Sequence, residues 1–312
     1  MASAPTLSVA IPLHRSRPWV DAIEANVARI PHASTEILIS DRTCLDDAVD
    51  VLADRLSDDP RVRFVRSADG LSWIEHYNDL LHRASGDFFM WMPHDDDFPS
   101  DYLPALVGAL TADERALLAF GCIEPILPDG SPHPTERFHC PASLLERPWS
   151  WEVALELALD WNLGIPFRGV MRRRAVLRWG LAVRPITGEV FADGYWVFAL
   201  ALHGPLVFVP SVSTCKRYYP TSTHAVWRSP SKFTRSMALG GLLWRHAPTF
   251  GAALRGSIVL AVDGAAKRLS RAMPSEVRRG LGPTVRSGRL RLRRWLLPTG
   301  DPETSGGPEP VP

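Results

Sequence analysis

The chain has 312 residues, 46% of them hydrophobic and 22% charged, which is the composition of an ordinary globular protein. This length suits one large domain, or one domain with a substantial extension. No stretch reaches the roughly 18 apolar residues of a membrane-spanning helix, and the N-terminus lacks the basic and apolar regions of a secretory signal. We therefore expect a protein that is neither secreted by a standard signal nor integral to a membrane.

The net charge of +1 hides an uneven distribution along the chain. Residues 227–300 contain 15 Lys or Arg against two acidic residues, whereas residues 1–226 are acidic overall. A basic C-terminal region could bind nucleic acid, but the acidic body and the lack of a nucleic-acid-binding motif argue against that partner.

The cysteines are widely spaced, with neither a CxxC pair nor the spacing of zinc ligands; they are Cys44, Cys122, Cys140 and Cys215. This pattern predicts a reducing, cytoplasmic setting without a disulfide framework.

The first hundred residues alternate between predicted strands and predicted helices. Short apolar runs predict strands over residues 7–12, 36–41, 62–65 and 88–92. Helical spacing of apolar residues predicts helices over residues 18–30, 46–56 and 72–84. Such alternation favours an α/β fold, with a mostly parallel, Rossmann-like sheet flanked by helices.

Carboxylates follow two of these predicted strands. The fourth strand runs directly into Asp95, Asp96 and Asp97, and the second ends in Asp41. Because the carboxyl ends of parallel strands meet at one edge of a sheet, these groups can act on the same ligand. Close carboxylates repel one another unless a cation lies between them, and Mg²⁺ shares such oxygen ligands with phosphates. The alternative is a solvated acidic turn before a helix that begins near Tyr102.

The first predicted strand is not followed by GxGxxG or by a P-loop pattern. Both dinucleotide binding of the Rossmann type and P-loop chemistry are therefore disfavoured. A nucleotide at this edge would be held by carboxylates on its sugar and base, and by a metal ion on its phosphates.

Several segments, in this order and spacing, resemble those of the family-two glycosyltransferases of the A-type fold. A first block comprises residues 8–12, 36–41, 78–87 and 95–103, and a second comprises residues 191–204, 207–210 and 216–219. The resemblance covers residues 7–225. It implies transfer of a sugar, with inversion, from a nucleoside diphosphate donor to an acceptor hydroxyl. We expect the donor to be UDP- or dTDP-linked.

The resemblance also implies roles for individual residues. The donor nucleotide would be bound by Pro12, His14, Asp41, Asp95 and Asp96. A divalent ion, Mg²⁺ or Mn²⁺, would be held by Asp95 and Asp97 and would bridge the diphosphate. Such an ion can neutralise the negative charge that develops on the departing diphosphate.

Asp193 falls at the position of the family's catalytic base. A sugar hydroxyl is a poor nucleophile at neutral pH, so its attack on the anomeric carbon needs a positioned proton acceptor. The alternative role for Asp193 is to cap the helix that runs to Leu202.

Further candidates for contacts to the acceptor or the diphosphate are Trp161, Lys216, Arg217 and His224. An aromatic ring can stack on a sugar, but most of the 11 tryptophans of this chain are expected to serve packing. A lone histidine is likewise more often structural than a ligand.

The sequence departs from the family pattern at three positions. Ala192 replaces one member of an acidic pair, and Arg42 stands where a second Asp is common. In one register, His94 takes the place of the Asp before the family's DxD pair.

We expect a glycosyltransferase domain over residues 1–226, a basic helical extension over 227–297 and a disordered tail over 298–312. The domain would consist of a donor half, 1–110, and an acceptor half, 111–226. The extension mixes arginines with Leu and Trp, so it can lie on an anionic membrane surface. It could equally pack on the acidic body or form a solvated face.

Two other functions remain open from the sequence. A nucleotidyltransferase could use a similar acidic sheet edge, although residues 14–17 supply only the charge of its usual basic, Gly-rich loop. A non-catalytic relative that binds a sugar nucleotide or a glycan could have lost part of its acidic pair. For the transferase, the acceptor could be a glycan, a lipid-linked sugar or a small molecule.

Overall fold

The computed structural model describes residues 6–31, 34–42, 45–67, 70–135, 138, 140–219, 230–272 and 296. The strands are β1 (Leu7–Leu13), β2 (Thr35–Asp41), β3 (Val62–Phe64), β4 (Phe88–Trp91), β5 (Leu118–Ile126), β6 (Val170–Arg172) and β7 (Leu206–Arg217). The helices are α1 (Val20–Arg29), α2 (Ala48–Arg55), α3 (Trp73–Arg83), α4 (Tyr102–Ala112), α5 (Ala142–Leu145), α6 (Trp151–Asp160), α7 (Arg173–Arg178), α8 (Ala192–Ala201), α10 (Lys232–His246) and α11 (Phe250–Ala272), with short 3-10 helices η1 (Arg17–Trp19) and η2 (Pro166–Arg168).

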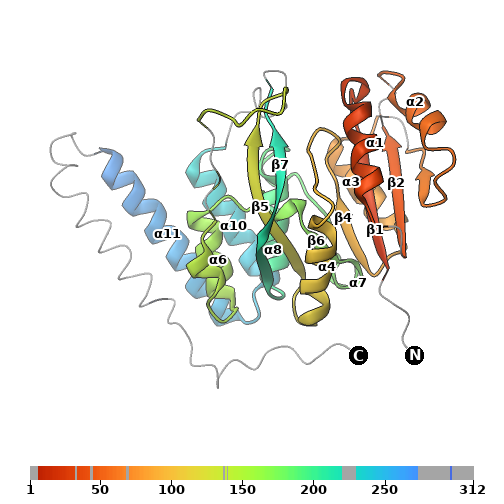
Figure 1. The fold of residues 1–312 in the computed structure, drawn as a ribbon. Coiled ribbons are helices and arrows are strands. Elements are labelled where there is room, and N and C mark those ends of the chain that lie inside the picture. The colour runs from red at the N-terminus through yellow and green to blue at the C-terminus, as the bar shows by residue number, and fades with distance from the viewer. Residues whose placement is uncertain are drawn as a thin grey trace.

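The described strands form one sheet in the order β3-β2-β1-β4-β6-β5-β7, with helices on both faces (Figure 1). All neighbouring strands are parallel except β6, which is antiparallel to both β4 and β5. The predicted α/β fold, with its mostly parallel sheet and C-terminal helices, is confirmed. Because β6 runs in the opposite direction, its amino end lies at the edge where the other strands have their carboxyl ends.

The sheet separates two hydrophobic cores. Side chains of a strand point alternately to the two faces, so Phe89 and Trp91 of β4 pack with α3, α6, α8 and α10. Phe88 and Met90 point the other way and pack with α1, α2 and α4. Strands buried on both faces read as continuous apolar runs, which is why these segments were recognisable in the sequence.

Two local features determine how the chain enters β4: the N-terminal cap of α3 and the close approach of Gly86 to β1. Helix α3 begins with a capping box, in which the Glu75 amide donates to Ser72 Oγ (3.2 Å) and the Ser72 amide to Glu75 Oε2 (2.8 Å). After α3, a Cβ on Gly86 would lie 2.6 Å from Ser8 Oγ. Only glycine therefore lets the chain pass this close to β1 on its way into β4.

Strand β7 runs from Leu206 to Arg217, well beyond residues 207–210, the segment that the family resemblance covers. It pairs with β5 in parallel to the end, with a shift of register between Phe120 and Cys122. Polar residues such as Ser211 and Ser213 interrupt the apolar pattern here, so the sequence does not mark this second half as a strand. The extension carries Lys216 and Arg217 to the same edge as the end of β4.

The C-terminal helices share the core of the main body. Leu239 and Leu243 of α10 and Leu260 of α11 are buried with residues of α6 and α8. At Gly256 a Cβ would lie 2.7 Å from Leu243 Cδ1, so α11 approaches α10 closely there. Of the helices that the structure describes, none combines the length and apolar character needed to cross a membrane.

Candidate active site

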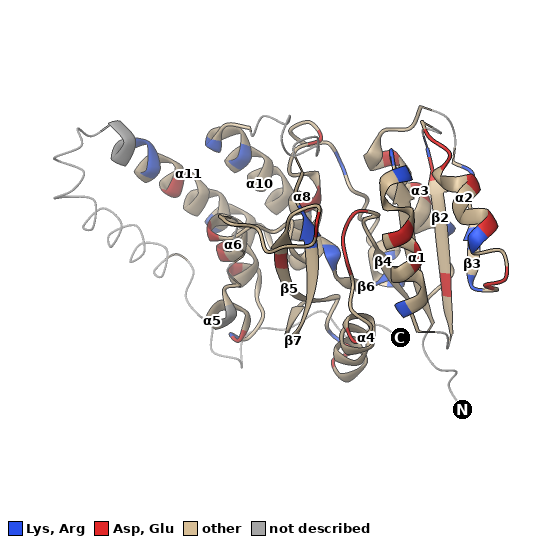
Figure 2. Cartoon of the chain, turned by 45° about the horizontal axis from the view of Figure 1, so that its top comes forward, with Lys and Arg blue, Asp and Glu red and all other residues tan. Residues whose placement is uncertain are grey.

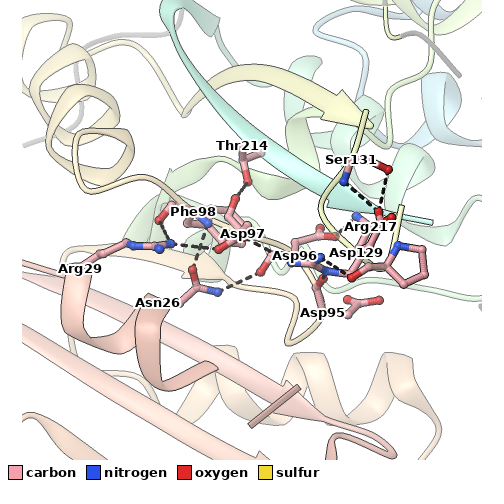
Figure 3. A network of polar contacts seen from close by, with 11 residues as sticks. Asn26, Arg29, Asp95, Asp96, Asp97, Phe98, Asp129, Ser131, Thr214 and Arg217 are labelled. Atoms are coloured by element: carbon pink, nitrogen blue, oxygen red, sulfur yellow. Dashed lines mark hydrogen bonds and ion pairs between the residues drawn. The ribbon is translucent and has the colours of Figure 1, made fainter. Parts of the chain in front are cut away.

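The acidic triplet follows β4 and is tied by its backbone to β7. The amide of Asp97 donates to the carbonyl of Cys215, and the amide of Cys215 donates to the carbonyl of Asp97 (both 2.9 Å). Thr214 Oγ1 also donates to the carbonyl of Asp97 (2.8 Å). Figure 2 shows the acidic loop that runs from β4 to α4, and Figure 3 shows its side chains. The triplet is thus held rigidly at the edge where β1, β2, β4, β5 and β7 end.

Asp97 is paired with two arginines. Its Oδ1 lies 2.9 Å from the guanidinium of Arg29, and its Oδ2 lies 3.3 Å from that of Arg217 (Figure 3). Asp97 is 35% exposed, whereas the side chain of Arg217 is 8% exposed. Both carboxylate oxygens therefore have cationic partners.

Asp96 is buried and forms the most enclosed ion pair of the site. Its Oδ2 accepts a hydrogen bond from Arg168 Nε (2.6 Å), and its Oδ1 accepts one from the amide of Arg217 (3.1 Å). Burial raises the pKa of Asp96, and the positive charge of Arg168 opposes that rise. Burial disfavours the charge of Arg168, but Asp96 and Asp95 outweigh it and raise the pKa of Arg168. The guanidinium therefore stays charged beneath the triplet.

Arg168 is a site residue that the sequence analysis missed. It ends η2, directly before Gly169 and the antiparallel strand β6, whose amino end lies at this edge. A Cβ on Gly169 would lie 2.2 Å from the carbonyl of Ala119, so the chain makes a close approach there. The sequence signal for this site residue was a single arginine placed between apolar residues and Gly169.

Asp95 has a different environment from its two neighbours. Its Oδ2 accepts a hydrogen bond from Tyr219 Oη (2.8 Å), and burial together with the Asp95 charge raises the pKa of that phenol. Among the described residues, Asp95 is the one member of the triplet without an ion pair. Its Oδ1 has no hydrogen-bond partner within the described ranges.

The ends of β1 and β2 bring further predicted residues to the edge. Asp41 is buried at the end of β2. His94 Nδ1 lies 3.1 Å from the carbonyl oxygen of Pro12. Within the described part of the chain, His14 Nδ1 is buried without a hydrogen-bond partner. Burial, followed by the charge of Arg42, lowers the pKa of His14, so this ring is neutral and can accept or donate a hydrogen bond.

Asp193 is the second residue of α8, and the residue before the helix is Phe191, with a φ of 64°. Asp193 Oδ1 accepts a hydrogen bond from the amide of the next residue, Gly194 (2.8 Å). A Cβ on Gly164 would lie 2.7 Å from Asp193 Oδ2. A left-handed, non-glycine residue costs energy and is found most often near functional sites.

Asp193 and the carboxylates of the triplet interact electrostatically with the same arginine, Arg168. The carboxylates of Asp96, Asp95 and Asp193 all raise the pKa of this arginine. Buried Lys216 also interacts with Asp193. Burial, and then the positive charge of Arg168, lower the pKa of Lys216 to about 8, and the carboxylates of Asp96, Asp193 and Asp95 partly oppose this fall. Asp193 and the triplet therefore act electrostatically on the same two cations, Arg168 and Lys216.

The remaining predicted residues lie in three different places. Lys216 is buried, with Nζ 5.0 Å from the ring centre of Tyr218. Arg217 forms the centre of the triplet network, since its Nε also donates to the carbonyl of Asp95 (3.1 Å). Trp161 packs on Phe120 at the start of the loop that reaches Gly164. His224 lies outside the described residues.

A metal ion can be assessed from these donors. No group of three His, Cys, Asp or Glu side chains arranged to hold a metal occurs among the described residues. Mg²⁺, however, is usually bound by one or two carboxylates, with substrate phosphates and water completing its ligands. The unpaired oxygen of Asp95 fits such a site. A metal bound at Asp97 would replace one of its two arginine contacts.

Known proteins resemble this chain in sequence family and in fold. The model of the family described as "Glycosyl transferase family 2" matches residues 8–178. No curated protein matches the chain.

Solved structures share the fold at low identity. A crystal structure of S. aureus TarS 1-349 in complex with UDP-GlcNAc superposes with a TM-score of 0.62 at 11% identity, covering 94% of this chain and 82% of the other. The mannosyltransferase PcManGT from Pyrobaculum calidifontis, in complex with GDP-Man and Mn²⁺, gives a TM-score of 0.55 at 17% identity, covering 95% and 86%. Both are A-type glycosyltransferases by fold. From the family match over more than half of its length, the chain belongs to glycosyl transferase family 2.

Proposed function

We propose that the protein transfers a sugar, with inversion, from a UDP- or dTDP-linked donor to an acceptor hydroxyl. The observation that supports this most is the acidic triplet at the carboxyl edge of the sheet, where Asp96 is paired with buried Arg168 and Arg217 binds the backbone and side chains of the triplet. A donor diphosphate needs cations around it, and an acceptor hydroxyl needs a base beside it. Family membership and two nucleotide-sugar complexes of the same fold agree with this reaction.

In this proposal the donor nucleotide lies along the ends of β1 and β2. Asp41 and His14 hydrogen-bond its base or ribose. The carbonyl of Pro12, which accepts a hydrogen bond from His94, lies beside them. Asp95 lies next to the ribose and diphosphate. Asp96, whose carboxylate is buried against Arg168, contributes to donor binding by positioning Arg168 and the backbone of Arg217.

The diphosphate is proposed to lie over the triplet, next to Lys216 and Arg217. Asp95, and Asp97 after release of one arginine, would hold Mg²⁺ or Mn²⁺. When bound, the ion neutralises charge on the departing diphosphate. The arginine released from Asp97 can then donate to a phosphate oxygen, an interaction that guanidinium groups make well.

Asp193 is the proposed base. It accepts the proton of the acceptor hydroxyl as that oxygen attacks the anomeric carbon. Ala192, at the position of the other acidic residue of the family pair, is buried and takes no part in proton transfer. Trp161, before the loop that contacts Asp193, is the proposed acceptor contact. The acceptor class remains a glycan, a lipid-linked sugar or a small molecule.

The assay that tests this proposal is release of nucleoside diphosphate from a panel of UDP-, dTDP- and GDP-sugars. We expect Asp193→Asn to lower the rate about 100-fold or more, the usual contribution of a general base, while donor binding is kept. Glu189→Gln is the matched control, because this exposed residue lies in the same approach to α8. Turnover that is equal in Asp193→Asn and wild type would favour the non-catalytic or nucleotidyltransferase alternatives.

We also propose that the protein acts in the cytoplasm and binds the membrane surface through α10 and α11. Exposed apolar side chains line these helices: Phe233, Met237, Trp244, Phe250, Leu254 and Ile258. Described basic residues of the two helices outnumber the single acidic residue, Asp263, so their charge matches an anionic bilayer (Figure 2). The three described cysteines, Cys122, Cys140 and Cys215, are free, as in a reducing compartment.

A further inference from the structure

A cavity lies apart from the acidic triplet, between α8, α10 and the segment that follows α7. Its volume is about 530 Å³, which is within the range of small-molecule sites. Part of its wall is apolar and aromatic, with Trp179, Leu181 and Leu242. The rest is basic, with Arg184, His203, Arg245 and His246. Nothing in the proposed transfer reaction uses these groups.

The basic groups of this cavity act on one another. His203 Nε2 lies 3.1 Å from His246 Nδ1, and the ring of Trp179 is stacked on His203 at 4.5 Å between centres. Burial and then His246 lower the pKa of His203 to about 4. Burial, followed by Arg245 and Arg184, lowers the pKa of His246. Two arginines and two imidazoles are thus close enough to repel further positive charge.

No counter-charge balances this cluster within the part of the chain that the structure describes. The lining of the cavity contains no Asp or Glu. The guanidinium groups of Arg184 and Arg245 have no ion pair or hydrogen bond to described residues. At the acidic triplet, by contrast, Arg29, Arg168 and Arg217 are all paired with carboxylates. Convergent cations without carboxylates are the arrangement that binds an anion.

The cavity is separate from the proposed donor site. Helix α8 carries Asp193 at its start and reaches the cavity with Tyr195, Trp196 and Ala199, ending just before His203. The lining includes none of the residues assigned to the donor or to proton transfer. Trp196 is shared, since it lines the cavity and packs edge-to-face on Trp91 beneath the triplet (ring centres 5.3 Å). A ligand here would therefore touch the same core that supports the catalytic edge.

We propose that this cavity binds an organic phosphate, with the phosphate between Arg184, Arg245 and His246 and its apolar or aromatic body against Trp179 and Leu242. Arginine forms paired, charge-assisted hydrogen bonds to phosphate oxygens. His246, which lines the cavity with both arginines, can donate one further hydrogen bond to the phosphate. The apolar wall selects a ligand larger than inorganic phosphate. This site does not depend on the assignment of the donor.

The test is calorimetric titration of the full chain with phenyl phosphate, octyl phosphate and inorganic phosphate. We expect a phosphate ester to bind more tightly than inorganic phosphate, because the apolar wall contacts only the ester. A preference for octyl over phenyl phosphate would point to a lipid phosphate, and the reverse to a soluble aromatic phosphate. If neither ester binds to the wild type, the proposal is wrong.

Variants locate the binding. Arg184→Gln with Arg245→Gln should weaken ester binding about tenfold or more, as expected for loss of hydrogen bonds between charged groups. Arg115→Gln with Arg174→Gln, which removes two exposed arginines outside the cavity, should bind as the wild type does. Equal affinity of the cavity variant and this control would overturn the proposal, since the ester would then occupy another site.

Three further measurements separate binding at this cavity from effects on folding and on donor binding. Melting temperatures of both double variants should match the wild type, because all four arginines are exposed. UDP binding should be unchanged in the cavity variant. The ring nitrogen resonances of His246 should shift on addition of the ester in the wild type, and an unchanged spectrum of His246 in the presence of bound ester would contradict the proposed site.

Discussion

Arg168 lies where the charges of the candidate active site meet. Its side chain is 13% exposed, and its partner Asp96 is 1% exposed. Removing one member of a buried ion pair leaves an uncompensated charge, which usually costs about 3–5 kcal/mol. Arg168 pairs with Asp96, so the network around Asp96 and Arg217 drawn in Figure 3 should depend on this arginine for stability as well as for function.

We expect Arg168→Met to lower the free energy of unfolding by about 3 kcal/mol, measured by urea denaturation. Adding Asp96→Asn to the same chain should recover part of the loss, because the stranded charge is removed. Arg174→Met, which breaks an ion pair of an 83% exposed arginine with Asp87, should change stability by less than about 1 kcal/mol. An Arg168→Met protein as stable as the wild type would show that Asp96 is not charged in the folded state.

Lys216 makes the stability of the folded protein depend on pH. Its pKa is lowered to about 8 in the folded protein, from a usual 10.5, because of burial and Arg168. Below about pH 8 both folded and unfolded states carry the proton, so the full penalty for the buried charge is present. Between about pH 8 and 10.5 the unfolded state binds more protons, so the contribution of this group to stability rises with pH.

Lys216→Met removes this penalty. We expect the variant to be more stable than the wild type at pH 7, on the order of 1–3 kcal/mol, with an advantage that shrinks as the pH rises from 8 towards 10.5. The measurement is urea denaturation of both proteins across this range. The variant should also bind nucleoside diphosphate less tightly at pH 7. A stability difference that does not change with pH would mean that Lys216 titrates normally.

The candidate site is built by loops that approach one another closely. The loop before η2 brings Gly164 to Asp193, and a Cβ there would lie 2.7 Å from the carboxylate. We expect Gly164→Ala to push Asp193 from its position and to lower sugar transfer at least tenfold, with donor affinity within about twofold of wild type. Rates and affinities of the purified variant provide the measurement.

Gly108→Ala is the matched control for this change. Gly108 lies in α4, and a Cβ there would meet nothing within 4 Å. Alanine should therefore stabilise the helix slightly and leave transfer unchanged. Loss of donor binding in Gly164→Ala as large as the loss of transfer would indicate that this loop contacts the donor rather than the base.

The elements also show which parts of the fold were predictable from sequence. Strands β1, β2 and β4 are buried on both faces, so their apolar runs marked them, and Asp41 and the triplet at their ends pointed to the site. The second half of β7 was not recognised, because its order comes from pairing with β5, which no local pattern records. Arg168 was missed for the same reason. Its place depends on the antiparallel strand β6, which brings it to an edge otherwise made of strand ends.

The chain combines an acidic sheet edge, the proposed donor site, with a helical pair, α10 and α11, that lies beyond β5 and β7 (Figure 1) and carries more basic than acidic described residues (Figure 2). The rings of Trp244 and Phe250 meet where α10 and α11 join, 5.3 Å apart, and are 51% and 73% exposed. Aromatic rings of this kind, flanked by arginines, insert at the boundary between lipid headgroups and chains.

We therefore expect the protein to float with vesicles that contain anionic lipid, and to do so less in Trp244→Ser with Phe250→Ser. Vesicles of neutral phosphatidylcholine should bind it weakly, because the arginines then have no counter-charge. Leu45→Ser, which removes another exposed apolar side chain, should have no effect. Flotation that is the same for neutral and anionic vesicles, or absent from both, would contradict a membrane-binding role for these helices.

We propose that the edge formed by Asp41, the acidic triplet and Arg217 binds a nucleoside diphosphate sugar together with a divalent ion. Thermal stabilisation by nucleoside diphosphates and their sugars, with and without Mg²⁺ or Mn²⁺, tests it most directly, since a ligand of the folded state adds about 2.7 kcal/mol of stability at 100 times its Kd. We predict a metal-dependent rise with a uridine or thymidine nucleotide, lost in Asp95→Ala and kept in Asp101→Ala, which removes an exposed carboxylate at the start of α4. No rise with any nucleotide, with either metal, would contradict the claim.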